Sequence, residues 1–320
     1  MKSQEKVTAF RNGEIKRNRG KGNMGMDVCT LCPRMCGVNR AAGEKGYCGM
    51  DATIRAARAA LHMWEEPCIS GTQGSGAVFF SGCSLRCIFC QNFEIAEGNC
   101  AKEISGERLS EIFLELQEQG AANINLVTAA HYVPAVIESL KKAKAQGMDL
   151  PVIYNSSGYE RVETVQMLEE VVDVWLPDFK YMDSKLAFAY SRAKDYPEVT
   201  RAAIREMMKA AGTCAYDEDG YIQKGVIVRH LILPGHTKNS IAVLDELYGT
   251  YGDDLTISLM NQYTPLPQVR NIPDLNRRVT KREYEKVLDH ALDLGITQGF
   301  FQEGGTAKES FIPLFDYEGL

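Results

Sequence analysis

The sequence contains no run of about eighteen consecutive apolar residues, which is the length that a membrane-spanning helix requires. No apolar segment of the kind found in export signals follows Met1 either. We therefore expect a cytoplasmic protein with no membrane partner. Basic charge is not in excess, because 36 lysines and arginines are outnumbered by 42 acidic residues, for a net charge of −6. A global attraction to nucleic acid is therefore not expected.

Cysteine is abundant, but a disulfide framework is not expected. Ten cysteines would suit crosslinks only in a small exported chain, and this chain has 320 residues and no export signal. Metal binding is therefore the better hypothesis. Seven of the ten fall into two short clusters, which are Cys29, Cys32, Cys36 with Cys48, and Cys83, Cys87 with Cys90. The scattered cysteines, expected to be small buried apolar residues, are Cys68, Cys100 and Cys214.

Composition divides the chain into four segments. Residues 1–26 are a polar tail, and its basic cluster is expected to be solvated rather than to bind an anion or a partner. That cluster consists of Lys16, Arg17, Arg19 and Lys21. Residues 27–70 are expected to form a Cys-rich metal-binding module, too irregular between 29 and 49 for a helix or strand. Residues 71–305 are the main domain, and residues 306–320 are a C-terminal tail.

Short apolar runs alternate with amphipathic helices from residue 77 onward, which is typical of βα units around a mainly parallel sheet. The fold class is therefore α/β. The expected strands are 77–80, 124–127, 152–154, 171–176, 226–233 and 255–260, with a weaker seventh near residues 300 and 301. A helix is expected over 108–119, another is opened by Pro197, and Thr280 with Glu283 forms a capping box for a third.

Cys83, Cys87 and Cys90 follow a predicted strand directly, in the stretch AVFFSGCSLRCIFCQN of residues 77–92. Ligands of parallel barrels bind where strands end, so this strand delivers three thiolates to the functional face. Three ligands leave one metal position open, whereas a cluster held only by protein, or a structural zinc, takes four. A cofactor can fill that position. The alternative is a four-ligand site completed by Cys100 or Cys68.

This stretch resembles the signature of the radical S-adenosylmethionine (SAM) superfamily, including the aromatic Phe89 just before the third cysteine. Its flanking Val-Phe-Phe-Ser-Gly-Cys and Cys-Gln-Asn more narrowly resemble the pyruvate formate-lyase activating enzymes. The similarity extends from about residue 77 to about residue 302, and the N-terminal cysteines resemble a module of an activating-enzyme homologue subgroup. The resemblance implies a partial (β/α)6 TIM-like barrel with a small N-terminal Cys-rich metal-binding extension. It also implies a [4Fe–4S] cluster on Cys83, Cys87 and Cys90, with SAM on the open iron.

The resemblance further implies that the reduced cluster passes one electron into SAM, giving methionine and a 5′-deoxyadenosyl radical that abstracts hydrogen from a substrate. No acid–base dyad is required, so the five histidines need not form one. The implied partners are flavodoxin or ferredoxin as electron donor and a protein substrate such as a glycyl radical enzyme. The alternatives are a radical SAM enzyme acting on a small molecule or peptide, and a non-catalytic iron–sulfur or zinc redox protein.

Other residues expected to bind the cofactor follow predicted strands. Asn155 and Ser156 open the segment Asn-Ser-Ser-Gly, which resembles the family's Asp-Thr-Asn-Gly beside SAM, although a plain Ser/Gly turn explains it equally well. Asp178-Phe-Lys180 resembles Asp-Leu-Lys, in which the lysine meets the SAM carboxylate and the aspartate lies near a monovalent cation. A buried structural ion pair is the alternative. Arg229, and Gln262 with Tyr263, are expected to line the pocket.

Two features of the family are missing. Many members have Gly-Gly-Glu after the second strand to hold the SAM amino group, but Thr128-Ala-Ala-His131 stands here, so backbone carbonyls or Thr128 would take that role. The ferredoxin-like insertion of most other activating enzymes is absent between Cys90 and Ile124.

The N-terminal set offers four thiolates, because Cys29-x-x-Cys32-x-x-x-Cys36 is followed by Cys48. Four sulfurs predict a closed site, and they suit either a structural zinc or a second [4Fe–4S] cluster. Zinc would staple the segment against the barrel, whereas a cluster would relay electrons.

Overall fold

The structure is a computed structural model that describes residues 26–302 and 313–320. The basic cluster near residue 19 lies outside the described residues, as do residues 303–312 of the expected barrel end and C-terminal tail. Strands and helices alternate along most of the described chain, and the α/β fold class is confirmed.

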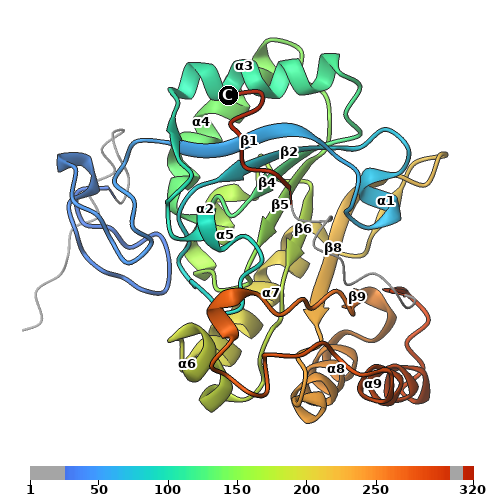
Figure 1. Ribbon diagram of the computed structural model, residues 1–320. Helices are drawn as coiled ribbons and strands as arrows, with labels where there is room; N and C mark the ends of the chain where they lie inside the picture. Colours follow the sequence, from blue (N-terminus) through green and yellow to red (C-terminus); the bar gives the residue numbers. More distant parts are fainter. Residues whose placement is uncertain (1–25, 303–312) are drawn as a thin grey trace, which may run out of the picture.

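One sheet runs through the centre of the described molecule (Figure 1). Its strand order is β10-β9-β8-β6-β5-β4-β2-β1-β3, with β7 paired to β8 beside this path. The strands are β1 Arg55–His62, β2 Ser75–Phe80, β3 Lys102–Glu103, β4 Ile124–Val127, β5 Val152–Ser156, β6 Val174–Pro177, β7 Ala215–Tyr216, β8 Ile222–Leu231, β9 Thr256–Met260 and β10 Gly299–Phe301. Along the path from β2 to β10 the described strands pair in parallel, and they match the seven predicted runs. The path is open at β10 and β3, as in a partial barrel.

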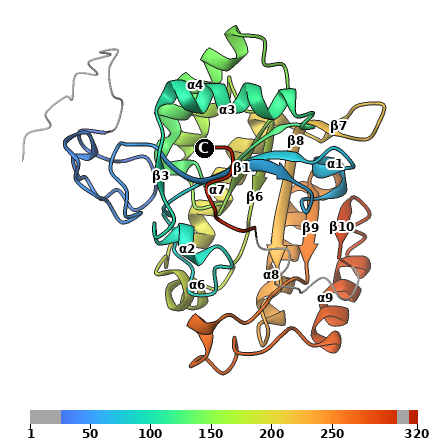
Figure 2. The same ribbon diagram turned by 45° about the horizontal axis from the view of Figure 1, so that its top comes forward.

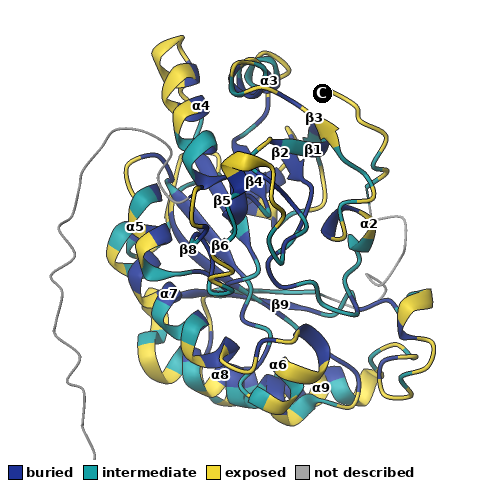
Figure 3. Cartoon of the chain, turned by 90° about the vertical axis from the view of Figure 1, so that its left-hand side faces the viewer, coloured by how far each residue is buried: buried dark blue, intermediate teal, exposed yellow. Residues whose placement is uncertain are grey.

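The longer helices cover the outer face of the sheet, and their yellow outward sides contrast with the dark blue strands in Figure 3. The helices are α1 Pro67–Ser70, α2 Phe93–Ala96, α3 Gly106–Glu118, α4 Val133–Ala145, α5 Val162–Leu168, α6 Ser184–Ser191, α7 Tyr196–Ala211, α8 Thr237–Tyr251 and α9 Lys281–Asp293. The expected capping box is present at Thr280, whose side chain accepts from the backbone N–H of Glu283. The periodic residues of α3 are buried, as predicted.

Strand β1 lies between β2 and the short β3 in the sheet and was not predicted. It pairs antiparallel with β2, and C-terminal residues bond to its other side. The backbone N–H of Tyr317 donates to Ala57 O at 3.0 Å, and that of Ala59 donates to Glu318 O at 2.8 Å. Parts of the expected N-terminal module and C-terminal tail are thus continuous with the main sheet, as Figure 2 shows for the two segments. The proposed domain boundaries themselves stay predictions.

Side chains that point into the barrel form an apolar layer and a polar layer. Cys68 and Ile69 of α1 pack with residues of the central strands in the apolar layer, which also contains Ile153, Val174, Leu176, Ile222 and Ile227. Asn155 and Arg229 follow two residues later on β5 and β8, so they face the same interior nearer the strand ends. At one end, the barrel interior is therefore filled by α1 and apolar side chains. At the other end, where the strands finish, it is lined by polar side chains.

In the part of the chain that the structure describes, no helix is long and apolar enough to cross a membrane.

Candidate functional site

Cys83, Cys87 and Cys90 lie beyond the end of β2, are all half-buried, and line one cavity of about 230 Å³. The same cavity is lined by the other residues expected to bind the cofactor, namely Phe89, Asn155, Ser156, Asp178, Lys180 and Arg229. The structure therefore brings these residues together. Gln262 also lines the cavity, whereas Tyr263 is buried behind it with its ring centroid 6.2 Å from that of Phe89.

Gly82 fixes the start of the cysteine loop. Its φ is +90°, and an added Cβ would lie 2.9 Å from the carbonyl oxygen of Cys48 and 3.1 Å from Nε2 of His131. Glycine adopts this backbone without strain, and no side chain fits the space. The residue before the first cluster cysteine is thus packed directly against the N-terminal module.

Polar groups surround the sulfurs of the loop. Cys83 Sγ accepts from the backbone N–H groups of Leu85 and Arg86, each at 3.4 Å, and the Ser191 hydroxyl donates to Cys87 Sγ at 3.1 Å. Burial raises the pKa of the Cys87 thiol, and the Lys180 ammonium opposes that rise. Metal binding deprotonates thiols, and these donors favour the thiolate form.

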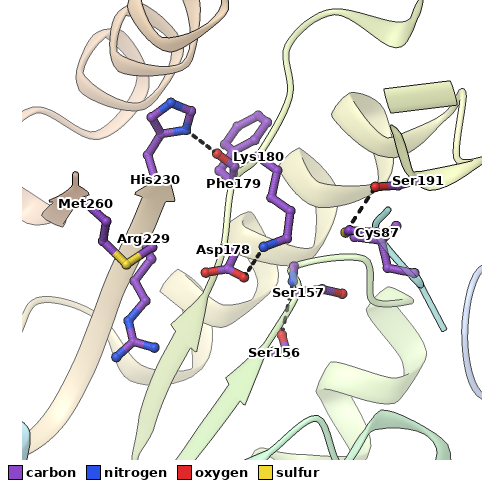
Figure 4. Close-up of polar contacts among 12 residues, drawn as sticks. Cys87, Ser156, Ser157, Asp178, Phe179, Lys180, Ser191, Arg229, His230 and Met260 are labelled. Atoms are coloured by element: carbon purple, nitrogen blue, oxygen red, sulfur yellow. Dashed lines mark hydrogen bonds and ion pairs between the residues drawn. The ribbon is translucent and has the colours of Figure 1, made fainter. Parts of the chain in front are cut away.

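Asp178 and Lys180 follow the end of β6 and form an ion pair, with 2.5 Å between Lys180 Nζ and Asp178 Oδ2. Burial alone would lower the pKa of Lys180, but Asp178 and Cys87 beside it raise that pKa well above its ordinary range. Figure 4 shows Lys180 extending between Asp178 and Cys87. The structural ion pair that the sequence left open is therefore present, and both partners line the cavity.

The ends of β5 and β4 carry unusual backbone geometry. An added Cβ at Gly158 would collide with the carbonyl oxygen of Asp178, so this turn is held close to β6. Thr128 has a φ of +64°, which is strained for a β-branched residue, and its N–H donates to Asn155 O at 2.9 Å. Thr128 lines the cavity where the family's Gly-Gly-Glu would stand.

Two acidic residues that the sequence analysis did not select belong to the same site. Glu65 lines the cavity, and Glu66 follows it in the connection between β1 and α1. Arg229 donates from Nε to Glu66 Oε1 at 2.9 Å and from Nη2 to Glu66 Oε2 at 2.5 Å, and Nη2 also contacts Glu65 Oε2. Burial alone would lower the pKa of Arg229, but the two carboxylates raise it. Glu66 and Arg229 are 163 positions apart in the sequence, so no local motif could have predicted this network.

The N-terminal cysteines form a second group beside the barrel. Cys29, Cys32 and Cys48 are buried and Cys36 is exposed. A Cβ added to Gly46 would lie 2.7 Å from Cys36 Sγ and 4.0 Å from Cys48 Sγ, so these two sulfurs flank one glycine. Burial raises the pKa of the Cys32 thiol to about 12.

Two arginines of the module hold it against the barrel. The buried Arg40 donates to the carbonyl oxygen of His131 at 2.5 Å and lies 3.9 Å from Cys29 Sγ. Arg34 donates from Nε to Ser84 O and from Nη2 to Ser191 O, both at 2.8 Å. Its guanidinium also lies 4.0 Å from the ring centroid of Tyr47. The module is therefore bonded directly to the loop between the first two cluster cysteines.

Within residues 26–302 and 313–320, no three or more His, Cys, Asp or Glu side chains are arranged to hold a single metal ion. A cubane places each thiolate on a different iron, so its ligands are spaced more widely than those of one ion. Three cysteines on one cavity wall, with donors to their sulfurs and an adjacent polar pocket, fit a cluster with an open iron.

Comparison with known proteins agrees with this architecture. The family model described as "Radical SAM superfamily" matches residues 77–247, which is more than half of the chain. The chain belongs to the radical SAM superfamily. The matched residues of this radical SAM protein span β2 to α8 and include the three cysteines, Asp178, Lys180 and Arg229.

A relative in Methanocaldococcus jannaschii, "Uncharacterized protein MJ0674", is 29% identical over 270 residues, covering 82% of this chain and 74% of the relative. Among solved structures, HydG, a maturase of the [FeFe]-hydrogenase, is 13% identical with a TM-score of 0.50, covering 74% of this chain and 54% of HydG. SuiB of Streptococcus suis bound to SAM is 14% identical with a TM-score of 0.45, covering 69% of this chain.

A domain of pyruvate-formate lyase-activating enzyme from Bacteroides vulgatus is 17% identical with a TM-score of 0.38, covering 54% of this chain and 92% of that domain. The chain spans about half the length of the SuiB and HydG chains that it matches, at 48% and 54%. At 13% identity, the likeness to HydG concerns the fold alone.

Proposed function

We propose that this radical SAM protein is an oxidoreductase that abstracts hydrogen from a protein or peptide, as the activating enzymes of glycyl radical enzymes do. One observation carries the proposal, which is the cavity shared by Cys83, Cys87, Cys90 and the Asp178–Lys180 pair. When bound, a [4Fe–4S] cluster on these cysteines would supply the electron for reductive cleavage of SAM, the chemistry that yields a hydrogen-abstracting radical.

The residues of the cavity would have distinct roles. Cys83, Cys87 and Cys90 would hold three irons, and Lys180 would pair with the SAM carboxylate through an ammonium hydrogen that Asp178 does not use. A monovalent cation beside Asp178 belongs to this proposal. The side chains of Asn155, Ser156 and Phe89 would orient SAM, and their buried surroundings would keep water from it. The backbone of Thr128 would receive the SAM amino group.

The N-terminal cysteines would hold either a structural zinc or a second [4Fe–4S] cluster. A second cluster is supported by the direct packing of Cys48 against Gly82, the residue before Cys83. A zinc site is supported by the four-sulfur set and its docking through Arg34 and Arg40. Iron and zinc analysis of the reconstituted protein separates the two.

The reaction needs an external one-electron donor, for which we propose flavodoxin or ferredoxin under anaerobic conditions. The cytoplasmic location expected from the sequence stays a prediction.

Electron paramagnetic resonance tests the substrate class. The reduced holoenzyme, SAM and glycyl radical enzymes from the same cell would be mixed, and a stable glycyl radical signal is expected in one of them. SAM cleavage that is stimulated by small molecules, with no protein-borne radical, would contradict this substrate class and favour the small-molecule alternative.

A further inference from the structure

Glu65 lies deep in the barrel although it precedes the first parallel strand. Its side chain is 8% exposed, and it forms part of the cavity wall that also contains the cysteine loop. Glu65 Oε1 accepts from Asn125 Nδ2 at 2.9 Å and from Asn155 Nδ2 at 3.4 Å. Asn125 and Asn155 belong to β4 and β5, so Glu65 is held by two strands of the barrel.

Charge around Glu65 is not balanced. Arg229 is the shared partner of Glu65 and Glu66, and it binds Glu66 through two nitrogens. Asp178 and Lys180 neutralise each other nearby. Burial lowers the pKa of His62, which also lines the cavity, so this imidazole is neutral at pH 7. Among these side chains, Glu65, Glu66 and Asp178 therefore face two cations, Arg229 and Lys180, which leaves one negative charge in a poorly solvated site before SAM and the proposed monovalent cation bind.

Aromatic rings complete the surroundings of Glu65. Trp64 and Phe79 line the same cavity, and Trp64 is 59% exposed. Ammonium and guanidinium groups bind favourably over aromatic faces. A cavity that combines aromatic side chains with a buried carboxylate is suited to a cationic nitrogen.

We propose that Glu65 binds a cationic nitrogen of the substrate, either a protonated amine or a guanidinium, and so positions that substrate in the cavity beside SAM. This inference rests on the proposed function, because it names the chemistry of the molecule from which hydrogen is taken. The cation belongs to a Lys or Arg side chain of a peptide or to a small amine, and the two sources share this chemistry.

Binding to the oxidised holoenzyme with SAM bound tests the site without turnover. Calorimetry would compare cadaverine, agmatine and the tripeptides Gly-Lys-Gly and Gly-Arg-Gly with neutral probes of matched size, 1-hexanol and Gly-norleucine-Gly. At least one cationic probe should bind roughly tenfold or more tightly than its neutral match, as expected for one charged hydrogen bond. Tighter binding of the tripeptides would identify a peptide side chain as the source of the cation. Tighter binding of cadaverine or agmatine would identify a small amine.

Glu65→Gln keeps the side-chain shape and the oxygen that accepts from Asn125, and it should abolish the preference for the cationic probe. The matched control is Glu163→Gln, an exposed carboxylate on α5, which should leave all binding unchanged. The comparison of cationic and neutral probes on the wild type remains decisive even if Glu65→Gln does not fold.

Three outcomes would each overturn the proposal. They are equal binding of cationic and neutral probes, no binding of any cationic probe, and a full preference for the cationic probe retained in folded Glu65→Gln. SAM cleavage by the wild type with dithionite is measured on the same preparation. Absent cleavage with intact cation binding would refute the proposed function and leave the Glu65 site standing, so the two failures are distinguishable.

Discussion

Arg34 joins the N-terminal cysteine module to the loop that carries the cluster cysteines, and its removal should release that loop. Besides its bonds to Ser84 and Ser191, Arg34 Nη1 donates to Arg192 O at 2.5 Å. Hydrogen bonds from a charged donor contribute about 1.5–3 kcal/mol each, and partial exposure reduces that value. We expect Arg34→Met to destabilise the docked loop by roughly 3 kcal/mol, since the carbonyl oxygens lose their donors.

Hydrogen exchange followed by mass spectrometry measures this effect locally. A loss of about 3 kcal/mol corresponds to roughly a hundredfold increase in the open population, so peptides covering 83–90 and 29–49 should exchange about a hundredfold faster. Arg34→Lys should recover only part of the protection, because an ammonium cannot reproduce the planar fork.

Arg161→Met provides the matched control. Arg161 Nη1 donates to Thr30 O at 2.5 Å and holds the module at a different point of the barrel. This variant should loosen residues 29–36 and leave the cysteine loop protected. Unchanged exchange of residues 83–90 in Arg34→Met, or equal loosening by Arg161→Met, would refute the role assigned to Arg34.

Three further predictions concern other parts of the site. Burial lowers the pKa of His230 to about 4, so the unfolded chain binds more protons between pH 6.5 and 4, and the free energy of unfolding falls as pH falls. In chemical unfolding, His230→Asn should remove about 3 kcal/mol of this decrease. An equal pH dependence in variant and wild type would contradict the prediction. Gly82→Ala should lower the free energy of unfolding in urea by about 2–4 kcal/mol. Gly147→Ala is the control, because its φ is +102° and no atom lies within 4 Å of an added Cβ, and it should cost about 1 kcal/mol. Equal costs would show that the packing at Gly82 is unimportant. Lys180→Met should weaken SAM binding by at least roughly tenfold in equilibrium dialysis, and unchanged affinity would remove Lys180 from the SAM site.

The parallel part of the fold could be predicted because each strand is a short apolar run followed by an amphipathic helix. Strand β1 could not, because Arg-Ala-Ala-Arg-Ala-Ala-Leu-His is rich in alanine and has little intrinsic preference for a strand. Its hydrogen bonds to β2 and to residues 317 and 318 make it a strand. Residues 57 and 59 pair with residues 317 and 318 at the far end of the chain, and such distant pairing leaves no local pattern in the sequence.

The candidate site likewise contains residues that could be predicted from the sequence and residues that could not. Cys83, Cys87 and Cys90 form a local motif, and Asp178 follows a strand whose position is clear from its apolar run. Glu65 instead reads as a surface residue, since Trp-Glu-Glu-Pro has no periodicity and carboxylates are rarely buried. Its partner Arg229 is 164 residues away, so only the fold brings them together.

The most direct measurement is 5′-deoxyadenosine production after anaerobic reconstitution with iron and sulfide, reduction with dithionite and addition of SAM. Wild type and Cys100→Ala should both form it, because Cys100 lies outside the three-cysteine set. Cys87→Ala should form none while circular dichroism shows a folded barrel. Undiminished product from Cys87→Ala, or none from a wild type with a full cluster and sufficient reductant, would contradict the assignment of SAM cleavage to this site.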